Sequence, residues 1–192
     1  MADKITQKGV TAINGDNAGR DIFKDISLEV MVYSGPISPM TALTETLKRE
    51  LRDNKEIQSI LPTLGHYMSL VDGDDVIGLE EKLRAANRDQ EIEKALGKKE
   101  IIAKRLQKHS TYRSAQEIYI LVLGNILERF KAYVTPLIES GAPDAEIKIC
   151  IFENVVNPTM NMMEQNALKI YWDEIWGMIY FLTGNCHIKW TT

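Results

Sequence analysis

The chain has 192 residues, of which 44% are hydrophobic and 26% charged, so it can bury a substantial core and is globular rather than disordered. Its 23 basic and 27 acidic residues give a formal net charge of -4, which provides no overall field for binding polyanions. The first ten residues lack the apolar segment of a signal peptide, and no apolar stretch is long enough to span a bilayer. Two cysteines that are well separated in sequence suit a reducing compartment. We therefore expect a cytoplasmic protein without membrane contact.

The first 35 residues form a predicted segment of their own, with a turn followed by a strand. In INGDNAGRDI, residues 13–22, glycines bracket residues that tolerate positive φ. Aliphatic residues then recur at every second position over 26–32. A phosphate-binding loop would need a helix directly behind it, which the alternation argues against. We therefore expect a small β element with open edges, which could serve in assembly. Its candidate interaction residues are Asp16, Asn17, Gly19, Arg20, Asp21 and Ile22.

Residues 36–192 form the predicted helical domain, so the chain as a whole is expected to be mainly α. Ser38 before Pro39 is a typical helix start, and the apolar spacing that follows predicts about five to six helices. The last of them is apolar on nearly every face over 175–182 and is expected at the centre of the domain. The main predicted helices begin at residue 39, near 57, and span 79–106, 115–137, 144–155 and 163–184.

No motif for catalysis, cofactor binding or metal binding is found. The DGDD turn at 72–75 lacks the ligand spacing of a calcium loop. The three histidines lie far apart, and no metal-ligand spacing links them to the cysteines. Cys186 and His187 are adjacent, which on a helix turns their side chains about 100° apart, so they cannot form a nucleophile and base pair. The sequence therefore predicts a protein that is not an enzyme and holds no cofactor.

Two alternatives remain open at this point. A small metal-dependent hydrolase or nuclease could use scattered carboxylates, namely Asp72, Asp74, Asp75 and Glu80. A nucleic-acid-binding module could use the basic stretch from Lys98 to Arg113. Acidic residues lie near that stretch and aromatic stacking groups are scarce, so its composition favours a solvated helix face over a nucleic-acid surface.

Two C-terminal stretches, IWGMIYFLTGNCHIKW at 175–190 and EIKICIFENVVNP at 146–158, resemble the C-terminal helical domain of prokaryotic ABC-three-component systems. The AGRDI end of the first motif is similar to a segment that often precedes such domains. The family's closing pattern is a Gly-Met-aromatic stretch followed by Cys-His and tryptophan. The residues that match it here are Gly177, Met178, Tyr180, Phe181, Cys186, His187 and Trp190.

The resemblance implies a component of an anti-invader complex that works with an ABC-type ATPase subunit and a small middle component. Domains of this family usually follow an effector module such as a nuclease or protease. Residues 1–35 contain none of the chemistry that an effector requires. We therefore expect a non-enzymatic adaptor subunit that mediates protein assembly and forms a homo-oligomer.

Overall fold

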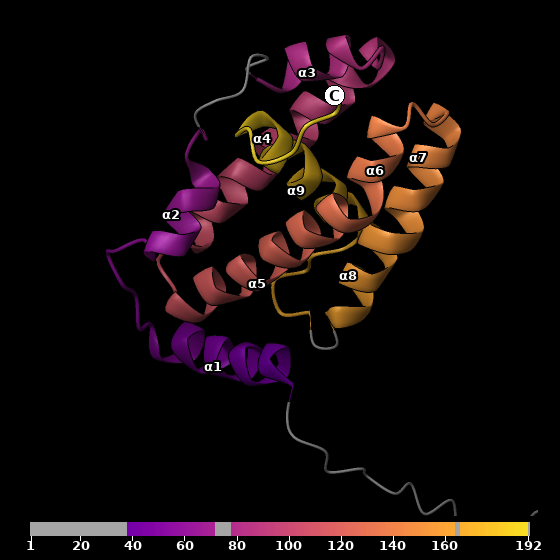
Figure 1. Cartoon of the computed structure of the whole chain (residues 1–192). Helices are drawn as coiled ribbons and strands as arrows, with labels where there is room; N and C mark the ends of the chain where they lie inside the picture. Colours follow the sequence, from indigo (N-terminus) through magenta and orange to yellow (C-terminus); the bar gives the residue numbers. More distant parts are fainter. Residues whose placement is uncertain (1–37, 72–77, 164–165, 192) are drawn as a thin grey trace, which may run out of the picture. The chain divides into compact units, whose positions relative to one another are not determined.

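The computed structural model describes residues 38–71, 78–163 and 166–191, and the described part of the chain is helical with no strand (Figure 1). The mainly α fold class is thus confirmed, whereas the expected N-terminal β element and its candidate interaction residues lie outside the described residues. The elements are α1 (Pro39–Asp53), α2 (Pro62–Met68), α3 (Leu79–Ala85), the 3₁₀ turn η1 (Asp89–Glu91), α4 (Ile92–His109), α5 (Arg113–Arg129), the π segment η2 (Phe130–Val134), α6 (Thr135–Glu139), α7 (Asp144–Ile151), the π segment η3 (Phe152–Val156), α8 (Asn157–Met162) and α9 (Trp172–Gly184).

The predicted number of about five to six helices was too low. The π segments join α5 to α6 and α7 to α8 without a break, so the described residues form seven continuous helices. The expected helix over 79–106 is two helices, because Asn87 adopts a left-handed conformation with φ 57° and turns the chain between α3 and α4. The helix expected over 144–155 instead continues to Met162.

The final helix begins at Trp172 rather than at residue 163. The Asn166 side chain makes two hydrogen bonds with the backbone of Ile170: it accepts one from the N–H at 2.7 Å and donates one to the carbonyl. Lys169 adopts a positive φ of 52°. Such local side-chain bonds offer the backbone an alternative to a helix. At the start of the helix the Glu174 side chain accepts a hydrogen bond from the Tyr171 N–H at 2.9 Å.

The core is built around α9, α4 and α5. Between Ile175 and Leu182 every residue of α9 except Trp176 is buried, which agrees with its predicted central position. Gly177 allows α4 to approach closely, because a Cβ at this position would lie 2.7 Å from the Ile102 side chain and 3.0 Å from the Lys98 carbonyl. In Figure 1 helix α5 runs across the domain, with α1 along one side of it. The two largest fully buried side chains, Tyr119 and Phe130, lie on the continuous α5–η2 helix.

Candidate functional site

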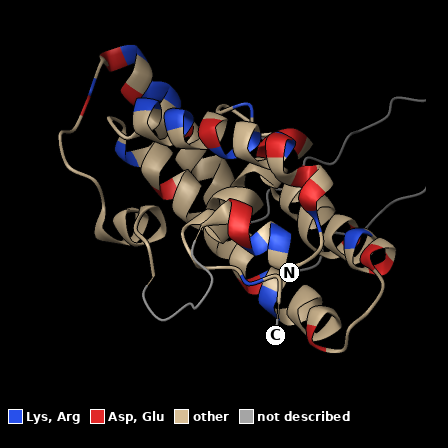
Figure 2. Ribbon diagram, turned by 90° about the horizontal axis from the view of Figure 1, so that it is seen from above, with Lys and Arg blue, Asp and Glu red and all other residues tan. Residues whose placement is uncertain are grey.

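A shallow, charged cleft of about 410 Å³ lies between η1 and α4, α7 and α9. Three lysines and two aromatic side chains line it together with acidic residues, so it is polar and apolar at once. Over the whole domain, basic and acidic residues are interspersed along the helices rather than segregated to one side (Figure 2). The lining residues of the cleft are Gln90, Glu91, Lys94, Lys98, Lys148, Asp173, Trp176 and Tyr180.

One wall of the cleft is an ion-pair network centred on Glu91. The Lys148 ammonium lies 2.7 Å from Glu91 Oε1 and 2.7 Å from Asp144 Oδ2, and hydrogen bonds to Asp144 and Glu91 raise the pKa of Lys148. Arg88, whose side chain is only 4% exposed, pairs with the same two carboxylates. The Tyr180 hydroxyl donates to Glu91 Oε2 at 3.4 Å, and burial together with the Glu91 charge raises the pKa of Tyr180 to about 12. This tyrosine therefore stays protonated and acts as a donor at neutral pH.

The opposite wall joins α4 to α9. Lys98 Nζ lies 2.6 Å from Asp173 Oδ1, and the hydrogen bond from Lys98 lowers the pKa of Asp173. Deeper in the contact, Arg105 lies 3.0 Å from Glu174 and donates to the Leu168 carbonyl at 3.1 Å. Because these cations are already paired with carboxylates from another helix, their main effect is to fix the shape of the cleft.

The C-terminal segment, residues 185–190, closes the domain behind Arg88. Trp190 is 4% exposed, and its indole N–H donates to Thr183 Oγ1 at 2.9 Å. Its ring meets Phe130 edge to face at 5.3 Å, and the Arg88 guanidinium carbon lies 4.4 Å from the ring centroid. A second cavity of about 250 Å³ is lined by both Arg88 and Trp190. Arg88 thus connects the charged cleft to the C-terminal segment.

The predicted structural motif residues lie in and just after α9. Met178 is fully buried, and Gly177 is the point of close contact with α4. Cys186 is buried and adopts a positive φ of 64°, so it turns the chain out of the helix, and both cysteines of the chain are free thiols. His187 follows it and packs against His66, while Trp190 ends the segment in the core.

Neither alternative site is assembled by the described residues. Glu80 pairs with Arg84 on its own helix, and the three aspartates proposed with it, Asp72, Asp74 and Asp75, lie outside the described residues. In the ranges 38–71, 78–163 and 166–191 no group of three or more His, Cys, Asp or Glu side chains has the geometry of a metal site. Within the basic stretch, Lys104 pairs with Glu100, in addition to the Lys98 and Arg105 pairs, which reduces the positive field that a nucleic acid would meet.

The network of Arg88, Glu91, Asp144 and Lys148 was missed from the sequence. These residues sit in ordinary polar stretches, and ionic residues so spaced usually lie on solvated surfaces. The i,i+4 spacing of Asp144 and Lys148 and the i,i+3 spacing of Arg88 and Glu91 were readable as pairs, but the contacts between the two pairs were not. Nothing local marks Arg88 as a buried cation, because its burial depends on Trp190 arriving from the far end of the domain.

Comparison with protein-family models matches residues 78–190 to C-terminal domain 9 of the ABC-three component (ABC-3C) systems. The chain belongs to this family. The match begins at the residue before α3 and ends at Trp190, so the charged cleft and the C-terminal segment lie entirely within it. The resemblance inferred from the closing motif is therefore confirmed, and the protein is a component of an ABC-three-component system.

No curated protein and no solved structure shows a significant match to the chain. Among the described helices, none is both long and apolar enough to cross a lipid bilayer.

Proposed function

We propose that this protein is a non-enzymatic adaptor subunit of its ABC-three-component system. Its helical domain binds the ABC-type ATPase subunit and the small middle component, and the chain self-associates within that complex. The observation that carries this proposal is the match of residues 78–190 to the C-terminal domain family, which spans both the charged cleft and the core that supports it.

The chemistry of the cleft supports a binding role. Its acidic groups accept hydrogen bonds or ion pairs from residues of other helices, as Glu91 does from Lys148 and Tyr180 and Asp173 does from Lys98. The hydrogen bond from Lys98 lowers the pKa of Asp173, which makes this carboxylate a poor general acid. Charged groups beside exposed apolar side chains suit a protein interface, which has an apolar centre and a polar rim.

The partner surface that we assign is the α7 side of this cleft. Ile149 and Phe152 are three residues apart on one continuous helix, and they are 58% and 45% exposed. Lys148, which lines the cleft, directly precedes Ile149. Two large apolar side chains beside a charged rim provide the anchor and rim composition of an interface.

The test is co-purification from cells that express the tagged full chain together with the ATPase and middle component encoded with it. The unchanged chain is expected to retain both partners at physiological salt. The variants Ile149→Glu and Phe152→Glu are expected to reduce recovery of at least one partner by tenfold or more, because each buries a charge in the interface. Leu51→Glu is the matched control, because Leu51 is 49% exposed on α1, outside the family match.

Unchanged recovery in both the Ile149→Glu and the Phe152→Glu variant would refute the assigned surface, and failure of the unchanged chain to retain either partner would refute the adaptor role. Metal-dependent cleavage of DNA or RNA by the purified chain would refute the non-enzymatic part of the proposal. Light scattering of the purified chain tests self-association, which requires a mass above that of the 21.8 kDa monomer.

A further inference from the structure

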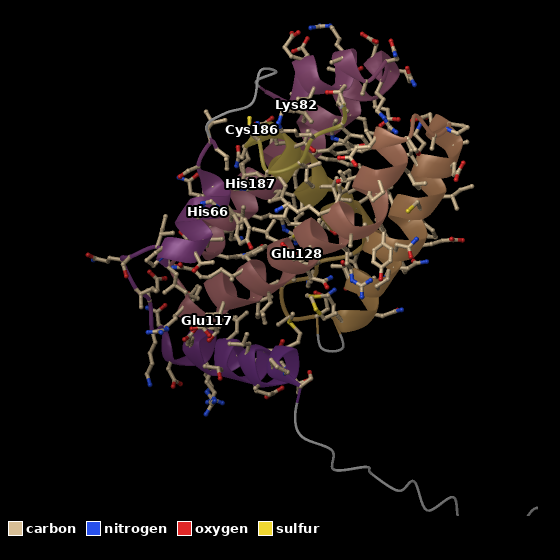
Figure 3. All side chains as sticks on the ribbon, viewed as in Figure 1. His66, Lys82, Glu117, Glu128, Cys186 and His187 are labelled. Atoms are coloured by element: carbon tan, nitrogen blue, oxygen red, sulfur yellow. The ribbon has the colours of Figure 1, made fainter. Side chains whose placement is uncertain are left out.

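Two histidines that are far apart in sequence meet at the surface of the domain. His66 lies on α2 and His187 in the C-terminal segment, and their ring centroids are 5.0 Å apart with the planes at 74° (Figure 3). Two hydrogen bonds fix the segments that carry them: Asn185 Nδ2 donates to the Tyr67 carbonyl at 3.0 Å, and the Val71 N–H donates to the Asn185 carbonyl at 3.1 Å. The pair is therefore positioned by the fold.

The His187 ring has one nitrogen without a partner. Its Nε2 is buried and has no hydrogen-bond partner, whereas the backbone carbonyls of His66 and Tyr67 lie near the ring. Because a neutral imidazole carries one N–H and one lone pair, a proton on Nδ1 leaves the lone pair of Nε2 free to bind a metal ion. An imidazole held by a backbone carbonyl through one nitrogen, with the other nitrogen free, is the arrangement found in metal-binding histidines.

The separation of the rings fits a shared ion. With Zn–N bonds of about 2.0–2.1 Å and ring centres about 1.2 Å beyond the nitrogens, two imidazoles on one tetrahedral ion have centroids about 5 Å apart. The observed distance between His66 and His187 is 5.0 Å. His66 is exposed, so an ion can reach its ring from solvent, whereas His187 Nε2 is buried.

We propose that His66 and His187 form a two-histidine site for a divalent transition-metal ion of the Zn²⁺ or Ni²⁺ type. Imidazole nitrogen suits these ions, whereas Mg²⁺ and Ca²⁺ require oxygen ligands. No third His, Cys, Asp or Glu of the described residues joins the pair in ligand geometry, so water completes the coordination and the ion exchanges readily. The site is independent of the adaptor role.

Neighbouring charges tune the affinity in a predictable direction. Lys131 on η2 is close enough to act electrostatically on His187, and its positive charge opposes a bound cation. Glu128 on α5 acts electrostatically on Tyr67. Replacing Lys131 by Gln should therefore strengthen metal binding, whereas no purely structural role of the histidine pair predicts that result.

The test is calorimetric titration of the full chain with Zn²⁺ and separately with Ni²⁺ at pH 7.5, alongside thermal unfolding with and without each ion. One ion per chain should bind and raise the Tm. His66→Gln and His187→Gln should each weaken binding at least tenfold, and Lys131→Gln should strengthen it by severalfold. His66→Gln is decisive because His66 is exposed and its loss leaves the core intact.

His109→Gln removes the remaining histidine and should leave metal binding unchanged, and Cys186→Ser should do the same, which separates the imidazole pair from the adjacent thiol. Magnesium should have no effect. An absence of binding, a Zn²⁺ affinity that survives His66→Gln, or a loss of binding in Cys186→Ser would overturn the proposal.

Discussion

Replacing Trp190 by Ala tests whether the C-terminal segment holds the domain together. The ring is 4% exposed, and its removal leaves a cavity beside Phe130 and Arg88. Replacing a buried tryptophan by alanine lowers the free energy of unfolding by about 3–5 kcal/mol. That range already contains the lost hydrogen bond to Thr183, worth about 0.5–1.5 kcal/mol, and the contact with the Arg88 guanidinium, worth up to about 2 kcal/mol.

The free energy of unfolding from urea denaturation, followed by far-UV circular dichroism, gives the measurement. Trp190→Phe should cost only about 1–2 kcal/mol, since it keeps an aromatic ring against Phe130 and loses the indole N–H. Trp172→Ala is the matched control, because Trp172 is 50% exposed on α9 and its loss should cost no more than about 1 kcal/mol. Equal costs for Trp190→Ala and Trp172→Ala would refute the view that the C-terminal segment closes the core.

Three further outcomes are expected. Ile179→Ala, at a fully buried position of α9, should lower the free energy of unfolding by about 2–5 kcal/mol, and an unchanged Tm would mean that α9 is not the central helix. Burial lowers the pKa of His109 below its unfolded value of about 6.5, so the unfolded chain binds more protons and stability should fall as pH decreases below about 6.5. Urea titrations at pH 7.5 and 5.5 should show a smaller loss in His109→Gln, and an equal loss would exclude His109 as a source. Deleting residues 1–24 should leave helical circular dichroism nearly unchanged while lowering the mass of the oligomer or complex in light scattering; an unfolded product or an unchanged mass would contradict the assembly role.

The helix starts and the central helix were predictable because they depend on neighbouring residues. Ser38 caps α1, its side chain accepting a bond from the Thr41 N–H at 3.2 Å, and Pro39 occupies the first turn. The all-round apolar run of α9 likewise required burial whatever its partners. The C-terminal motif identified the family for the same reason, since its residues are contiguous in sequence.

The short helix expected around residues 57–61 is wrong, and its failure has a long-range cause. The fully buried Gln116 side chain accepts from the Leu61 N–H at 2.6 Å and donates to the Ser59 carbonyl at 2.9 Å. These bonds satisfy the backbone in an extended conformation, and α2 starts only at Pro62. Asn54 ends α1 in a left-handed conformation with φ 51°. No local pattern reveals a glutamine more than fifty residues away.

The candidate site escaped prediction for a similar reason. The pairing of Arg88 with Asp144, of Lys98 with Asp173 and of His66 with His187 depends on how separate helices pack. Sequence spacing therefore excluded a metal site that involves histidines close together in the chain, but it could not address histidines that the fold brings together.

The π segments explain how two prolines remain inside continuous helices. Pro136 lies in the first turn of α6, directly after η2, and Pro158 lies in the first turn of α8, directly after η3. A proline lacks the N–H for the helical ladder and its ring crowds the preceding turn, which normally ends or kinks a helix. A π turn widens the preceding turn, so the chain accommodates the proline without stopping. The Pro158 helix therefore continues where the sequence predicted an end, and it carries Phe152 on η3, beside the charged cleft where we place the partner surface.

If that surface is correct, Pro158→Ala should preserve the helix but relax η3 toward regular α-helix. A one-residue change in register would rotate α8, from Asn157 on, by about 100° relative to Lys148, Ile149 and Phe152, because Phe152 bonds to Lys148 in α-helical spacing and precedes the wide turn. The packing of α8 against α5 and α9 should then weaken and the Tm fall, while partner recovery in the co-purification assay stays constant. A loss of recovery at unchanged Tm would mean that the partner surface extends onto α8.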